Sequence, residues 1–74
     1  MAKSIHCYLS ELLDAYQRYT GKTCTEIALD FDVTLSNLYE YRNGRGNPTA
    51  RTIDKIVNGV EANCRRALEE TSWR

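Results

Sequence analysis

The basic side chains that could bind an anion are concentrated between residues 34 and 55. Four cations against two anions give this segment a net charge of +2, whereas residues 1–33 carry −2 and the whole chain is neutral. The cations and the glycines among them are Arg42, Arg45, Arg51, Lys55, Gly44 and Gly46. Guanidinium groups beside glycines are suited to phosphate oxygens, because glycine lets the backbone approach closely. The segment is therefore predicted to contact an anionic ligand, and the alternative is a solvated surface.

The cysteines and the histidine indicate neither a metal site nor a catalytic site. Cys7, Cys24 and Cys64 are odd in number and widely spaced, and His6 has no evident catalytic partner. We expect no metal, no cofactor, no small-molecule substrate and no enzymatic activity. We also expect three reduced thiols in a soluble cytoplasmic protein, because no apolar run is long enough for a signal peptide or a membrane span.

The spacing of apolar residues predicts three helices in the first 42 residues. The first helix can begin after Ser4 and end before Gly21, which suits a left-handed position. A second, short helix can begin at a capping box formed by Thr23 and Glu26. A third follows Thr34 and runs over residues 35–42, with Leu38 and Tyr41 as its inward face.

The remainder of the chain predicts a loop and then one or two helices. Residues 42–48 hold two glycines, two asparagines and a proline, which is typical of a loop, and Thr49 or Asn47 can cap the next helix. Helical spacing then continues to Leu68, but Asn58 and Gly59 make a break equally defensible. The prediction is an all-α domain of four or five helices.

Residues 23–42 have the pattern of a helix-turn-helix, in which Ala28, Val33 and Leu38 lie five residues apart. The chain here resembles the Cro and lambda-repressor-like (XRE-type) helix-turn-helix family. The matching segments are Thr25-Glu26-Ile27-Ala28, Val33-Thr34, Leu38-Tyr39, Tyr41-Arg42-Asn43-Gly44, Pro48-Thr49, Thr52-Ile53 and Lys55-Ile56. The family usually has glycine where this chain has Asp32, which tolerates a left-handed conformation with some strain and is expected to point to solvent. The resemblance implies one compact DNA-binding domain over residues 1–74.

The resemblance also implies which residues would contact DNA. The helix over residues 35–42 would enter the major groove with its N-terminal residues against base edges. Base-reading positions fall on Leu35, Ser36 and Glu40, and positions at the margin between base and backbone fall on Thr34, Asn37 and Tyr39. Phosphate contacts fall on Thr23, Arg42, Asn43, Gly44, Arg45 and Arg51. Because no Arg, Gln or Asn occupies a base-reading position, we expect specificity to depend on apolar contacts and DNA shape as well as on hydrogen bonds.

A single helix-turn-helix contacts about half a binding site, so the resemblance implies a homodimer on a pseudo-palindromic operator. Residues 60–74 are the candidate dimerisation segment, with Val60, Cys64, Leu68 and Trp73 as candidate interface residues. The alternative is that these side chains only cover the first helix of their own chain.

The implied function is transcriptional regulation through double-stranded DNA, by a small repressor of the kind found in phages and other mobile elements. Its regulation would come from concentration, operator overlap or a protein antagonist. The rival function is a protein interaction module with the same fold, such as an antirepressor or an antitoxin. The neutral charge favours the rival, and the Arg42-Asn43-Gly44-Arg45 loop favours DNA.

Overall fold

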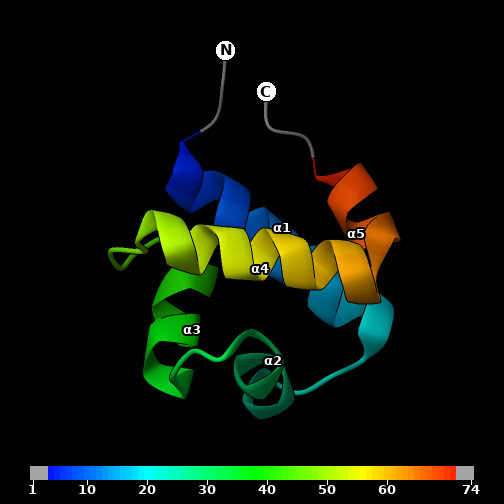
Figure 1. The fold of residues 1–74 in the computed structure, drawn as a ribbon, viewed down its shortest axis with the longest axis horizontal. Coiled ribbons are helices and arrows are strands. Elements are labelled where there is room, and N and C mark those ends of the chain that lie inside the picture. Colours follow the sequence, from blue (N-terminus) through cyan, green and yellow to red (C-terminus); the bar gives the residue numbers. More distant parts are fainter. Residues whose placement is uncertain (1–3, 72–74) are drawn as a thin grey trace.

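A computed structural model describes residues 4–71, and five helices account for most of them (Figure 1). The helices are α1 (Ile5–Thr20), α2 (Cys24–Phe31), α3 (Leu35–Arg42), α4 (Ala50–Asn63) and α5 (Arg65–Glu70). Within residues 4–71 there is no strand. The predicted all-α class is confirmed, and the open choice between four and five helices is settled at five.

The first four helices begin at the side chains that the sequence predicts as N-caps. In each case a hydroxyl oxygen accepts a hydrogen bond from the amide three residues later, which satisfies one of the free N–H groups of the first turn. The pairs are Ser4 with Cys7 at 3.1 Å, Thr23 with Glu26 at 3.3 Å, Thr34 with Asn37 at 3.1 Å and Thr49 with Thr52 at 3.2 Å. Gly21 ends α1 in the left-handed conformation, with φ of 70°. Local chain chemistry therefore fixes where these helices start.

The hydrophobic core is built around α1, which packs against α3 and α5, while α4 packs against α2 and α5. In Figure 1, α4 crosses in front of α1, and α2 and α3 lie together on one side of it. The largest fully buried side chains are Leu9, Leu12, Leu13, Tyr16, Ile27, Leu38, Ile56 and Val60. Because Leu38 of α3 is in this set, the orientation of α3 is fixed by the core.

The break between the last two helices falls at Cys64, not at Gly59. Cys64 has φ of −155° and ψ of 76°, outside the helical region, whereas Gly59 lies inside α4. A Cβ atom at Gly59 would come within 2.5 Å of Phe31 Cε1. A glycine at this position lets α2 and α4 approach closely, and of the two alternatives left open by the sequence, a break at Asn58 and Gly59 is not found.

No helix in the described part of the chain is long and apolar enough to cross a membrane.

Candidate nucleic-acid interface

The third helix, α3, has one face in the core and the opposite face in solvent. Leu38 is fully buried and Tyr41 nearly so, as the sequence predicts. Thr34 holds the start of the helix, because its hydroxyl accepts a hydrogen bond from the amide of Asn37. The inward side thus anchors α3 to the rest of the domain and leaves the other side free to contact a partner.

The outward face of α3 carries most of the residues predicted to read bases. Leu35, Ser36 and Tyr39 are exposed, and Glu40 is partly exposed. Positions i, i+1, i+4 and i+5 lie on one face of a helix, so these four side chains form one continuous surface. We call Leu35, Ser36, Tyr39 and Glu40 the outer face of α3. Thr34 and Asn37 are exposed beside it, at the N-terminal end of the helix.

The turn between α2 and α3 contains Asp32, a residue that the sequence predicts in a left-handed conformation. Asp32 has φ of 55° and ψ of 48°, the left-handed conformation expected for it. The Val33 amide donates to the Ala28 carbonyl at 3.0 Å and closes the turn. The Asp32 side chain is 91% exposed and pairs with Lys55 at 3.3 Å, so it points into solvent as predicted.

The backbone amides predicted to approach a phosphate are already used inside the chain. The amide of Asn43 donates to the carbonyls of Tyr39 and Glu40, and that of Gly44 donates to the carbonyl of Tyr41. The amide of Arg45 donates to the carbonyl of Glu40 at 2.8 Å. These bonds close the C-terminal end of α3, so the amides do not form the open anion cradle that the glycines suggested.

Thr23 is also engaged internally. Its amide donates to Glu26 Oε1 at 2.9 Å, and its hydroxyl lies 3.1 Å from the same oxygen. These hydrogen bonds, led by the one from the backbone amide, lower the pKa of the Glu26 carboxyl below its ordinary value. A phosphate at this position would have to compete with the Glu26 carboxylate. The capping box, which is present as predicted, therefore disfavours the predicted phosphate contact of Thr23.

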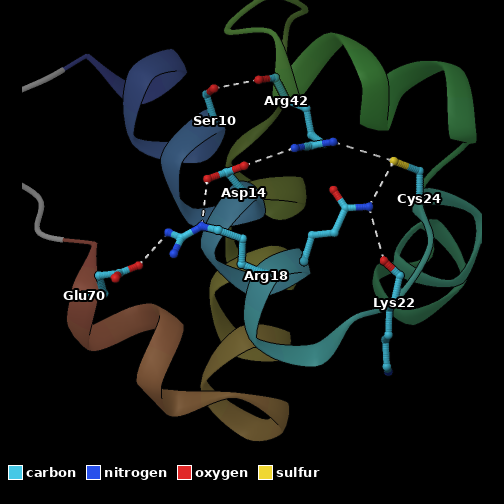
Figure 2. A network of polar contacts seen from close by, with 8 residues as sticks. Ser10, Asp14, Arg18, Lys22, Cys24, Arg42 and Glu70 are labelled. Atoms are coloured by element: carbon cyan, nitrogen blue, oxygen red, sulfur yellow. Dashed lines mark hydrogen bonds and ion pairs between the residues drawn. The ribbon is translucent and has the colours of Figure 1, made fainter.

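Arg42 does not present the free guanidinium expected for a phosphate contact. It reaches back to α1, where its Nη2 donates to Asp14 Oδ1 at 3.2 Å, and Figure 2 shows this link. Its Nη1 donates to Cys24 Sγ at 3.8 Å, and its Nε is buried with no hydrogen-bond partner within residues 4–71. This side chain therefore joins α1, α2 and α3, and its predicted phosphate contact stays a prediction.

The Arg42–Asp14 pair belongs to a longer polar network that runs across α1 (Figure 2). Arg18 donates to Asp14 at 3.1 Å and to Glu70 of α5 at 2.8 Å. The hydrogen bonds to Glu70 and then to Asp14 raise the pKa of the Arg18 guanidinium. Ser10 donates from its hydroxyl to the Arg42 carbonyl at 2.6 Å. We call Ser10, Asp14, Arg18, Arg42 and Glu70 the α1 network.

This network is not among the features predicted from the sequence, although the spacing of its residues on α1 gives a signal for it. Ser10, Asp14 and Arg18 are spaced by four residues, so they form a polar stripe along one side of α1. Because the stripe lies beside the buried face of α1, its side chains reach residues of α3 and α5. The stripe alone, however, does not say which distant cation it will meet.

Two arginines of the predicted phosphate-binding set are exposed to solvent. Arg45 is exposed and pairs with Glu40 at 3.3 Å, a surface ion pair that contributes little to stability. Arg51 is exposed in the first turn of α4 and forms no ion pair within the described residues. The predicted phosphate-binding set of six thus supplies two guanidinium groups that are exposed to solvent.

The candidate dimerisation residues are largely covered by their own chain. Val60 is 0% exposed and lies in α4, so it belongs to the core and is not available to a second copy. Cys64 and Leu68 are partly buried and pack against the core. Trp73 lies outside the described residues. Val60 is therefore a core residue and not an interface residue. The interface roles of Cys64 and Leu68 stay predictions.

The three cysteines are free, and residues 4–71 contain no group of three or more His, Cys, Asp or Glu side chains that could hold a metal ion. Comparison with known proteins finds no matching family model, no significantly similar curated protein and no significantly similar solved structure.

Proposed function

We propose that this protein is a sequence-specific double-stranded DNA-binding regulator of transcription that inserts α3 into the major groove. The observation that carries the proposal is the outer face of α3, which is exposed while the opposite face is locked in the core. An α-helix with its side chains is about 10–12 Å across, and the major groove is about 12 Å wide. The outer face is therefore short, rigid and accessible enough to contact base edges.

The surroundings of α3 support the same use. Arg45 follows the C-terminal end of α3 and Arg51 lies in the first turn of α4, so the segment directly after the helix carries two exposed cations. Phosphate contacts position a protein on DNA, whereas contacts to base edges give specificity. Two cations per chain bind the backbone weakly, so we propose that two copies act together on a pseudo-palindromic operator.

The test is selection of bound sequences from a pool of random duplexes by the reduced protein, with light scattering on the same sample. An enriched two-fold motif and the mass of a dimer on DNA are the expected results. Failure to enrich any motif at low salt contradicts the proposal.

Two asparagines provide a matched pair of variants for this test. Asn37→Asp puts a negative charge beside the outer face of α3, whereas Asn58→Asp makes the same chemical change on the exposed side of α4. Asn37 lies in the first turn of α3, where a carboxylate is favourable for the helix, so loss of binding would not come from unfolding. We expect Asn37→Asp to abolish enrichment of the motif and Asn58→Asp to retain it.

One observation favours the rival function of a protein interaction module. Leu29 of α2 is 77% exposed, the most exposed large apolar side chain in the described chain, and it is not on the outer face of α3. A protein partner would cover such a side chain. In that case the duplex pool gives no motif, and Leu29→Lys, not Asn37→Asp, disrupts binding to a protein partner.

A further inference from the structure

The outer face of α3 contains an apolar strip whose chemistry indicates what kind of base edge it contacts. Only four large hydrophobic side chains are exposed in the described residues, and two of them, Leu35 and Tyr39, are on this face. Leu35 is 38% exposed and Tyr39 is 49% exposed. They are four residues apart, so they lie one above the other on the helix. A partner that covers them removes apolar surface from water.

The polar residues of the outer face are less suited to dominate recognition. Glu40 pairs with Arg45 through Oε2 at 3.3 Å, so a cytosine amino group would share this carboxylate with Arg45. Ser36 is exposed, but a hydroxyl can donate or accept and does not discriminate strongly between bases. Asn37 is two residues from both Leu35 and Tyr39, which places it on the opposite side of the helix from this strip. The apolar strip is therefore the most distinctive chemical feature of this face.

We propose that Leu35 and Tyr39 are specificity-determining residues that contact the 5-methyl groups of thymine. This inference rests on the proposed function. In the major groove, every base pair presents hydrogen-bond donors and acceptors. Only pairs that contain thymine also present an apolar methyl group. An operator for this protein therefore has thymines at fixed positions in each half-site, opposite Leu35 and Tyr39 of α3.

The test compares thymine with uracil, because the two bases differ only by the methyl group. Two pools of random duplexes are made, one with thymidine and one with deoxyuridine, and the reduced protein selects from each. The motif enriched from the thymidine pool is then synthesised in both forms, and both duplexes are titrated at the same salt concentration. We expect the uracil duplex to bind roughly four-fold more weakly for each contacted methyl, the effect of burying one such group.

Alanine variants test whether Leu35 and Tyr39 cause the difference in affinity between the thymine and uracil duplexes. Leu35→Ala should reduce the ratio of thymine to uracil affinity toward one, and Tyr39→Ala should reduce it at its own positions. Leu29→Ala is the matched control, because it removes the same side chain from an exposed position on α2 and should leave the ratio unchanged. Circular dichroism of each variant verifies that the helices are retained.

The outcomes separate this inference from the proposed function. A motif that binds equally well with uracil, or a motif without fixed thymines, overturns the methyl contact but leaves DNA binding intact. Binding to neither pool at low salt overturns both. A uracil penalty that Leu35→Ala and Tyr39→Ala leave unchanged assigns the methyl contact to other residues and also contradicts the inference.

Discussion

The two ends of α3 use their polar and apolar side chains in opposite ways. At the C-terminal end, Arg42 is turned inward and pairs with Asp14, and the backbone amides that follow close the helix. At the N-terminal end, Leu35 and Ser36 are exposed and only the cap at Thr34 is engaged. The C-terminal end of α3 therefore stabilises the fold, while the side chains at its N-terminal end are available to a partner.

The same contrast divides the arginines. Arg18 and Arg42 both pair with Asp14 in the α1 network, whereas Arg45 and Arg51 are exposed on the surface. The +2 charge of residues 34–55 therefore overstates the charge that a ligand would meet. Affinity for DNA would depend on a few phosphate contacts, on the outer face of α3 and on pairing of two copies.

The largest effect separates two leucines of the same helix. Leu38→Ala removes a fully buried side chain and should lower the free energy of unfolding by about 2–5 kcal/mol. Leu35→Ala removes an exposed one and should change the free energy of unfolding by about 0.5 kcal/mol or less, while it weakens binding to the selected duplex. Urea denaturation measures the first quantity and duplex titration the second. Equal stability losses would show that α3 has no free face.

The close approach of α2 and α4 gives the next largest effect. Gly59→Ala forces a Cβ atom against the buried ring of Phe31, which also packs against Tyr16 with ring centroids 5.1 Å apart. Overpacking of this kind should cost about 1–3 kcal/mol, although alanine favours helix more than glycine does. Thermal unfolding measures it, with Asn58→Ala in the same turn as the control. A stabilised Gly59→Ala protein would contradict the packing described for α2 and α4.

Substitution of Arg42 should affect the stability of the fold, whereas substitution of Arg45 should affect DNA binding. Arg42→Ala should lower the free energy of unfolding by about 1 kcal/mol, because it removes hydrogen bonds to Asp14 and Cys24. Arg45→Ala should leave stability unchanged and reduce the salt dependence of duplex binding by about 0.9 logarithmic units per phosphate contact. Denaturation and binding at several salt concentrations distinguish them. An Arg42→Ala protein of full stability but reduced salt dependence would reverse the two assignments.

The smallest effect concerns the capping box at the start of α2. Hydrogen bonds from Thr23 lower the pKa of Glu26, so the folded state favours the carboxylate. The resulting stabilisation is present at neutral pH and is lost as pH falls from the unfolded pKa, near 4.5, through the lower folded pKa. Glu26→Gln should remove this part of the acid dependence, and Glu69→Gln on the exposed side of α5 is the control. Identical pH profiles of stability for the two variants would contradict the role of the capping box.

The parts of the fold that depend on neighbouring residues could be predicted from the sequence. The caps at Ser4, Thr23 and Thr34 act over three residues, and Asp32 adopts the left-handed turn expected of it. The inward positions of Leu38 and Tyr41 follow from helical spacing and are confirmed. Each of these features is set by chemistry within one or two helical turns.

The features that were missed depend on contacts between distant segments. Arg42 meets Asp14 across 28 positions, and Gly59 meets Phe31, a residue of a different helix. A basic residue in a glycine-rich loop has the same sequence appearance whether it points outward or inward. Val60 fits helical spacing equally well as a core residue and as an interface residue, and only packing against the other helices decides between them.

The outer face of α3 is the binding surface that we propose for this protein. The most direct test is a titration of the ¹⁵N-labelled protein with the duplex selected from the random pool, followed by amide chemical shifts. We expect the largest chemical-shift changes at residues 34–40, Arg45 and Arg51. The amides around Arg18 and Glu70 should change little. Largest changes at Leu29 or along the α1 network, or no changes with any duplex, would contradict this proposal.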